Sequence, residues 1–203
     1  MKITRFLPTL IAASAWAFVA VPESHAVPID YSFTGVAQGN LAGNGFGETS
    51  FEFNFIGDTA NVVALPGNEL VMYQFSSETV TVGTLGTYSL NAPMQVFDLG
   101  GIPGFGDRSE PGVFLAIGAL GPSLLTYDMA SDFGPVTGDT FANDGQSIPL
   151  VGGGTVSMYA FEPENTFQAT TSSPVPDNCP AIGLFCIGLG AIAASGVLRR
   201  HAI

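Results

Sequence analysis

Carboxylates are the side chains of this sequence with the clearest capacity for chemistry. Residues 27–174 contain fifteen Asp and Glu residues and a single basic residue, Arg108. Two carboxyl groups on either side of a glycosidic bond can hydrolyse it, one as acid and the other as base or nucleophile. Asp107 and Glu110, in GFGDRSEPG, are candidates for such a pair. Because fifteen carboxylates produce such spacings by chance, we favour a solvated loop and keep a carboxylate-only glycoside hydrolase as an alternative.

Calcium suits these side chains better than a sugar linkage does. Ca²⁺ takes about six to eight oxygen ligands, which loops rich in Asp, Asn and Gly supply. The stretch TGDTFANDGQS offers Asp139, Asn143 and Asp144 as a candidate Ca²⁺ site, although their spacing differs from that of an EF-hand. An ordinary Asn-Asp-Gly turn is the alternative. Asp107 and Glu110 form a second candidate position, and no other metal or cofactor is expected.

Residues 27–174 lack Lys, His and Cys altogether. The usual Ser-His-Asp and Cys-His sites, zinc sites built from His or Cys, and the Gly-Lys phosphate loop therefore cannot form within them. We accordingly predict that the protein is not an enzyme and has no catalytic residues. Fifteen carboxylates against one arginine give the segment a formal charge of −14, which repels a phosphate backbone and argues against nucleic acid as a partner.

These side chains must be positioned by short strands and glycine-rich turns. In ETSFEFNF, Phe51, Phe53 and Phe55 alternate with polar residues, which is the period of a strand with one buried face. At least nine such runs, among them LVMYQF, MQVFDL, VFLAI and TVSMYAF, are separated by turn signals such as GNGFG and GGIPGFGD. The spacing predicts one all-β domain over residues 27–174, an antiparallel β-sandwich of jelly-roll-like form whose thirteen Phe residues fill much of the core.

Residues 1–26 are typical of a secretory signal peptide. A positively charged start is followed by an uncharged, mostly apolar run and then by small residues that a signal peptidase reads. These parts are Lys2 with Arg5, residues 6–21, and Ser24 with Ala26, ahead of Val27 as the first mature residue. The alternative is an N-terminal anchor that is never cut, but the run is short for a membrane span.

A second uncharged apolar run, residues 181–198, is followed at once by Arg199 and Arg200. Eighteen residues are near the lower limit for a bilayer-spanning helix and cover roughly 27 Å as a helix. The two arginines place the C-terminus in the cytoplasm and the β domain outside. A core helix of the domain is the alternative. TTSSP, residues 170–174, is either a linker to this tail or the end of a last edge strand.

The span is preceded by a short motif, Val175-Pro176-Asp177. A signal peptide, a Val-Pro-acid motif, a span and a terminal Arg pair in one chain resemble the PEP-CTERM proteins of Gram-negative bacteria. The usual core of their sorting motif is Val-Pro-Glu-Pro. This chain has Asn178 after Asp177, so it is similar to the Val-Pro-Asp variants. The resemblance covers residues 175–203.

The resemblance implies a route rather than an activity. Such proteins are exported through the inner membrane, held there by the tail and then processed near the motif by an exosortase-type protease. Signal peptidase, that protease and the membrane are the implied partners, and extracellular polysaccharide is a candidate partner. We therefore expect a non-enzymatic protein of the cell surface or extracellular matrix, with a signal peptide (1–26), a secreted domain (27–174) and a sorting tail (175–203). A permanently anchored single-pass surface protein or adhesin is the alternative.

Overall fold

The structure is a computed structural model, and it describes residues 26–109, 113–118, 124–142 and 146–172. These residues form antiparallel strands with two short 3-10 helices, so the prediction of an all-β, antiparallel domain is confirmed. The elements are β1 (Pro28–Leu41), β2 (Asn44–Asp58), η1 (Thr59–Asn61), β3 (Val62–Leu65), β4 (Glu69–Met72), β5 (Phe75–Val82), β6 (Gly86–Ser89), β7 (Met94–Leu99), β8 (Pro103–Asp107), β9 (Leu115–Gly118), η2 (Leu124–Thr126), β10 (Phe133–Ala142), β11 (Ser147–Pro149), β12 (Thr155–Tyr159) and β13 (Asn165–Thr171).

The longest pair, β1 and β2, follows directly from the alternation seen in the sequence. Phe51, Phe53 and Phe55 of β2 are buried, whereas the residues between them are exposed or half-buried. A two-residue turn joins the strands, and both of its residues, Ala42 and Gly43, have positive φ angles of 51° and 87°. Such turns match the right-handed twist of the strands that they connect.

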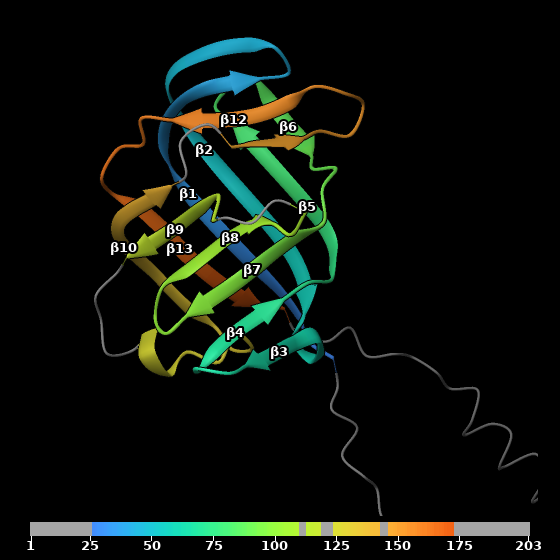
Figure 1. Ribbon diagram of the computed structural model, residues 1–203, viewed down its shortest axis with the longest axis vertical. Coiled ribbons are helices and arrows are strands. Elements are labelled where there is room, and N and C mark those ends of the chain that lie inside the picture. The colour runs from blue at the N-terminus through green and yellow to red at the C-terminus, as the bar shows by residue number, and fades with distance from the viewer. Residues whose placement is uncertain (1–25, 110–112, 119–123, 143–145, 173–203) are drawn as a thin grey trace, which may run out of the picture.

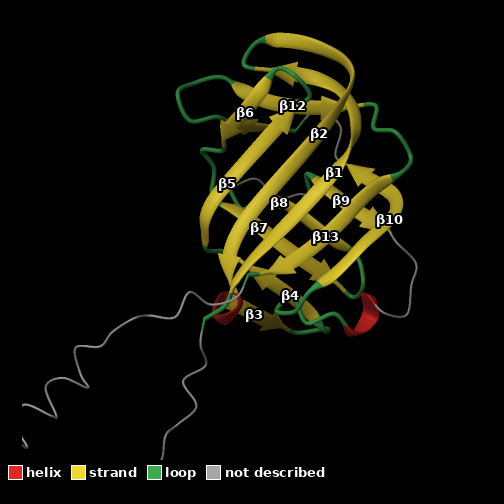
Figure 2. Cartoon of the chain, turned by 180° about the vertical axis from the view of Figure 1, so that it is seen from behind, coloured by secondary structure: helices red, strands yellow, loops and turns green. Residues whose placement is uncertain are grey.

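The strands follow one another in a single order across the fold. That order is β3-β4-β7-β8-β9-β10-β13-β1-β2-β5-β6, and β10 is the strand at which the sheet changes layer. Its first part, Phe133–Gly138, pairs with β13, and its last part, Asp139–Ala142, pairs with β9. We call β3, β4, β7, β8 and β9 with the end of β10 the front layer, and β13, β1, β2, β5 and β6 the back layer. Figures 1 and 2 show the two layers from opposite sides.

The core lies between the two layers, as in a β-sandwich. Phe105 of β8 is fully buried, and its ring centroid lies 4.6 Å from that of Phe53, 4.9 Å from that of Phe33 and 5.0 Å from that of Phe55. The first ring comes from the front layer and the other three come from the back layer. This aromatic contact therefore joins the layers, in agreement with the prediction that Phe residues fill much of the core.

The ends of the back layer are linked by β11 and β12. β12 pairs with the last residues of β1, and β11 pairs with β12. Leu150 then forms an isolated bridge to Leu90, next to β6. The backbone N–H of Asn91 donates a hydrogen bond to the Pro149 carbonyl (2.8 Å). The backbone N–H of Val151 donates one to the Ser89 carbonyl (2.9 Å). This end of the back layer therefore closes into a ring of strands (Figure 1).

The end of β13 corrects one prediction. Thr170 and Thr171 belong to β13, which lies between β1 and β10, so these two residues form neither a linker nor an edge strand. Their position is fixed by pairing with Asp30 and Ile29 of β1. The predicted signal peptide up to residue 25 and the predicted tail from residue 175 lie outside the described residues. Among the residues that are described, no helix is long and apolar enough to cross a membrane.

Candidate functional site

Asp107, one member of the predicted acid pair, closes the turn that follows β8. Its Oδ1 accepts hydrogen bonds from the Ser109 N–H (2.8 Å) and from the Ser109 hydroxyl (2.6 Å). Glu110, the other member, lies outside the described residues. The contacts described for Asp107 are therefore those of a carboxylate that stabilises its own turn.

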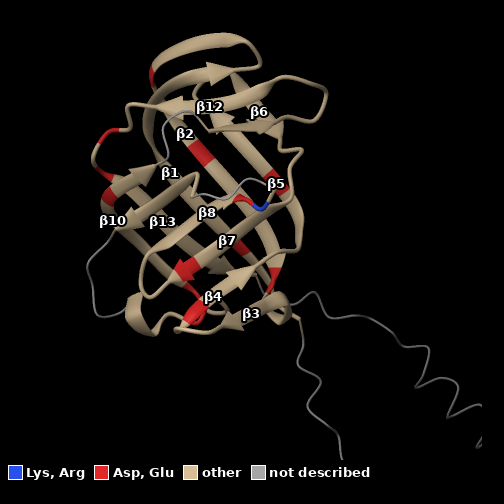
Figure 3. Cartoon of the chain, in the orientation of Figure 1, with Lys and Arg blue, Asp and Glu red and all other residues tan. Residues whose placement is uncertain are grey.

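Asp139, one member of the predicted Ca²⁺ site, is exposed on β10 opposite Gly118 of β9. Asn143 and Asp144 lie outside the described residues, so the site stays a prediction. Within the described ranges, no group of three or more His, Cys, Asp or Glu side chains could share a metal ion. Figure 3 shows the acidic positions scattered over both layers rather than gathered at one place.

The predicted signal-peptidase position lies where the described chain begins. Ala26 is exposed, and Val27 is half-buried because its backbone pairs with Thr59. The Val27 N–H donates to the Thr59 hydroxyl (3.2 Å), and the Val27 carbonyl accepts from the Thr59 N–H (3.0 Å). The remaining residues predicted for cleavage, sorting and orientation lie outside the described residues: Ser24, Val175, Pro176, Asp177, Arg199 and Arg200.

The most distinctive feature of the outer side of the front layer is a row of apolar residues whose two end members are exposed and whose four central members are buried. Each member is paired directly with the next across neighbouring strands, so all of them point to the same side of the sheet. We call this set the outer row, and its members are Val63, Val71, Phe97, Gly104, Ala116 and Phe141. Val71, Phe97 and Ala116 form an apolar cluster separate from the main core, and Tyr73 and Val113 pack against it.

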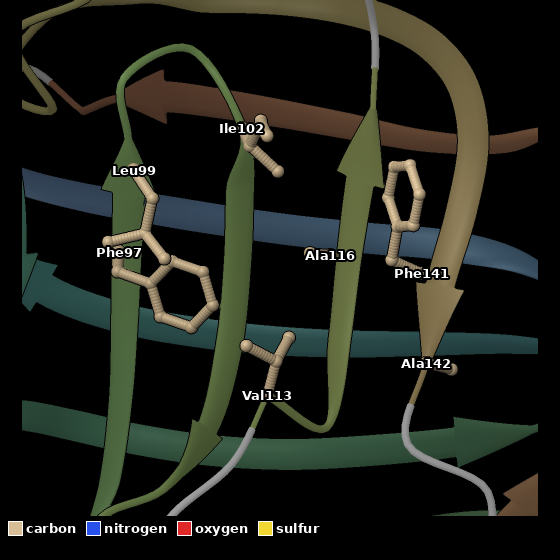
Figure 4. A pocket seen from close by; sticks show the side chains of 7 residues that line it. All are labelled: Phe97, Leu99, Ile102, Val113, Ala116, Phe141 and Ala142. Carbon is tan, nitrogen blue, oxygen red and sulfur yellow. The ribbon is translucent and has the colours of Figure 1, made fainter.

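Two glycines leave room for aromatic rings to lie on the sheet. A Cβ atom at Gly104 would lie 2.6 Å from the Phe97 ring, and one at Gly118 would overlap the Phe141 ring. The rings stand on either side of a groove of about 410 Å³, with Ala116 between them (Figure 4). The described residues that line the groove are Phe97, Leu99, Ile102, Val113, Ala116, Phe141 and Ala142.

The floor of the groove is closed and its rim is open to solvent. Phe97 and Ala116 are each only 4% exposed, whereas Phe141 is 58% exposed and Leu99 and Ile102 are about 40% exposed. None of the seven lining residues carries a titratable side chain. This groove can therefore bind by burying apolar surface, which is favourable by about 25 cal/mol per Å².

The edge of the apolar cluster carries the only arginine of the domain. The Arg108 guanidinium lies over the Tyr73 ring, 4.3 Å from its centroid, in the geometry of a cation–π contact. The backbone N–H of Arg108 also donates a hydrogen bond to the Pro93 carbonyl (2.9 Å). The positive charge therefore lies over Tyr73, which packs against the apolar cluster of Val71, Phe97 and Ala116.

A buried carboxylate holds the turn that carries two rim residues. The Asp98 Oδ1 accepts a hydrogen bond of 2.7 Å from the Gly101 N–H, in the turn between Leu99 and Ile102. Gly100 and Gly101 have φ angles of 63° and 95°, which side chains other than glycine rarely adopt. Burial raises the pKa of Asp98, although hydrogen bonds from the turn oppose the shift. The turn that carries Leu99 and Ile102 is therefore held by Asp98, an acid whose ionised form is disfavoured by burial.

The sequence contained a signal for the outer row that alternation alone did not reveal. VFLAI and MQVFDL contain runs of consecutive apolar residues, which indicate strands covered on both faces. In β9, Leu115 and Ile117 face the core and Ala116 faces the outer cluster. Which residues of neighbouring strands lie side by side in the row depends on the register of the strand pairs. The sequence alone did not show that register.

Comparison of the chain with protein-family models, with curated proteins and with solved structures found no match. The groove and its surroundings are therefore interpreted from their own residues.

Proposed function

We propose that this chain is an exported, non-enzymatic protein of the cell surface or extracellular matrix, and that its β domain binds a partner through the outer row. The observation that carries the binding role is the alignment of apolar residues across the outer face of the front layer. Val63 and Phe141 of the row, and the rim residues Leu99 and Ile102, are exposed, and exposed apolar surface of this kind marks interaction sites in soluble domains. The lining supplies contact surface and no acid or base.

Export and sorting are supported by the two terminal segments of the sequence. In this proposal signal peptidase cuts after Ala26, and residues 181–198 hold the chain in the inner membrane with Arg199 and Arg200 in the cytoplasm. An exosortase-type protease then acts near Val175-Pro176-Asp177 and releases the domain from the membrane of a Gram-negative cell.

The proposed setting is a matrix that contains exopolysaccharide. The formal charge of −14 on residues 27–174 keeps domains apart at low salt, and salt or divalent cations outside the cell would screen that repulsion. Ca²⁺ binding at Asp139, Asn143 and Asp144, and the jelly-roll-like form of the sandwich, both remain predictions. An apolar groove favours contact with an apolar part of a matrix component over the hydroxyl groups of a sugar.

The sorting part of the proposal is tested by deleting residues 175–203. The shortened protein should be found in the periplasm or the medium and should no longer be retained at the surface. Normal surface retention after the deletion would contradict the sorting role. Mass spectrometry of the mature protein separates this route from permanent anchoring, because processing gives a C-terminus near Asp177 and an anchor keeps Ile203.

The binding part is tested by changing the rim of the groove in the full chain. Phe141→Ser should reduce the amount of mature domain retained in the matrix, because the exposed ring forms one side of the groove. Tyr159→Ser is the matched control, since Tyr159 is an exposed aromatic residue on β12 that does not line the groove. Equal retention of the two variants would remove the groove from the proposal.

A further inference from the structure

The described chain begins and ends at one end of the domain. The Ser172 N–H donates a hydrogen bond to the Pro28 carbonyl (2.9 Å), so the two ends of the described chain lie side by side. Figures 1 and 2 show from opposite sides that β3 and the two 3-10 helices lie at this same end of the molecule. Residues on β3 and η2 therefore face the surroundings into which the C-terminal segment continues.

Four exposed apolar side chains gather at this end, and we call them the apolar tip. Leu99 and Ile102 flank one turn, across which the Leu99 N–H donates a hydrogen bond to the Ile102 carbonyl (3.2 Å). A Cβ atom at Gly101 of that turn would lie 3.2 Å from Cδ2 of Leu125, so η2 packs against the same turn. The members of the apolar tip are Leu65, Leu99, Ile102 and Leu125, which are 36%, 40%, 38% and 70% exposed.

The fold holds these side chains outward. In η2, Leu124 is buried in the domain, and the adjacent Leu125 is the most exposed large apolar residue of the described ranges. Leu65 of β3 and Leu99 of β7 both pair with Glu69 of β4, so they point to the same side of the sheet. Exposed apolar groups of this kind mark protein-binding or membrane-binding surfaces.

The proposed membrane anchor would keep the apolar tip beside a bilayer. Eight residues, 173–180, separate the last described residue from the proposed span, and they extend to at most about 26–29 Å. A surface on so short a tether meets the bilayer at a high effective concentration. The bilayer is therefore the apolar environment that this end of the anchored domain meets most often.

We propose that the apolar tip binds the lipid bilayer while the chain is anchored, with its side chains in the boundary between headgroups and acyl chains. This proposal rests on the proposed function for the anchoring by residues 181–198, whereas the lipid-binding surface consists only of described residues. The domain carries a formal charge of −14, and Glu69 lies between Leu65 and Leu99. Anionic headgroups would repel these charges, so the tip should prefer lipids without net charge.

The test uses the mature chain with its tail, residues 27–203, in phosphatidylcholine vesicles. Part of the lipid carries a nitroxide, which quenches a fluorophore in contact with the bilayer. Cys179→Ser and Cys186→Ser remove the native thiols, because residues 27–174 contain no cysteine. Leu125→Cys then carries the fluorophore at the apolar tip.

The matched control is the same fluorophore on Leu85→Cys. Leu85 is an exposed leucine in the turn between β5 and β6, as Leu125 is an exposed leucine in η2. Its turn lies at the opposite end of the domain, because β5 runs from Phe75, paired with Gly57 near the chain ends, to Val82. The label at Leu125→Cys should be quenched about tenfold more strongly, which corresponds to about 1.4 kcal/mol in favour of the contact. Equal quenching at the two positions would overturn the proposal.

A second substitution separates lipid binding from mere nearness to the bilayer. Ile102→Ser in the labelled Leu125→Cys chain should lower the quenching toward the control value, because it removes an apolar neighbour of the label. Tyr159→Ser is the matched control, since Tyr159 is exposed on β12 and pairs with Gln38, far along β1 from the chain ends. If Ile102→Ser leaves the quenching unchanged, the tether alone brings the label to the lipid and the apolar tip does not bind it.

Flotation of the same vesicles distinguishes this proposal from the proposed function. A chain that does not float with the vesicles contradicts the anchoring by residues 181–198, and the lipid contact of the tip is then rejected as well. A chain that floats but shows equal quenching at both positions contradicts the lipid contact alone. Energy transfer between labels on two chains, without quenching by the lipid, would identify a second copy as the occupant of the tip in place of the bilayer.

Discussion

The outer faces of the two layers differ in polarity, although both layers belong to one continuous order of strands. Across the back layer, Gln168, Ser32, Asn54, Thr79 and Ser89 are paired in a row that is entirely polar. Across the front layer, the corresponding row contains only apolar residues and glycine. A solvated face needs polar side chains at alternate positions, so the front layer departs from what a free surface requires. The comparison supports the proposal that the front layer is the interacting face of the domain.

The largest expected effect on stability comes from removing the Phe105 ring, which joins the two layers. Phe105→Ala should lower the free energy of unfolding by about 3–5 kcal/mol, because it leaves a cavity among Phe33, Phe53 and Phe55. Urea denaturation of the full chain would measure this change. Phe141→Ala is the control in the same layer, and its effect should be within about 1 kcal/mol because the ring is largely exposed. Similar losses in both variants would mean that the outer row is part of the core.

A substitution beneath the Phe97 ring, which lines the groove, should have the next largest effect. Gly104→Val would place a side chain against the Phe97 ring and 2.7 Å from the Leu115 carbonyl. Overpacking of this kind lowers the free energy of unfolding by about 1–3 kcal/mol. It should also displace the Phe97 ring, which lines the groove, and binding of an apolar fluorescent dye would report this change. Gly47→Ala is the matched control, since a Cβ atom at Gly47 has no atom within 4 Å. Unchanged stability and dye binding in Gly104→Val would contradict the close packing of the Phe97 ring on Gly104.

A substitution at the exposed rim tests the binding capacity of the outer face without disturbing the fold. In the chain shortened by deletion of residues 175–203, Phe141→Ser should weaken binding of an apolar dye by about tenfold. This factor is equivalent to a loss of about 1.4 kcal/mol in the free energy of binding. Tyr159→Ser should leave dye binding unchanged, because Tyr159 is exposed outside the groove. A fluorescence titration gives both values. Equal losses would mean that the dye reports general exposure of aromatic residues.

The same difference between layers explains how far the sequence could predict the molecule. Phe51, Phe53 and Phe55 alternate with polar residues, and alternation is a local property that shows which face is buried. In the front layer, Val96 and Phe97 are consecutive and both buried, so the sequence marks a strand covered on two sides without showing what covers it. The groove was not predicted because it depends on the pairing of Phe97, Gly104 and Ala116, three residues brought together only by register.

The smallest expected effect concerns the acid that holds the rim in place. Burial raises the pKa of Asp98 in the folded protein, so the folded form binds its proton more tightly than the unfolded form does. The stability that this provides is present below the ordinary pKa of an aspartate and is lost as the pH rises through the raised pKa. Asp98→Asn keeps an oxygen that can accept from the Gly101 N–H but carries no charge. The variant should therefore gain stability relative to the parent as the pH rises from 3.5 toward 7, in paired urea denaturation series. Parallel pH profiles would show that the Asp98 carboxylate is not penalised by burial, and the turn that carries Leu99 and Ile102 would then be held by its hydrogen bonds alone.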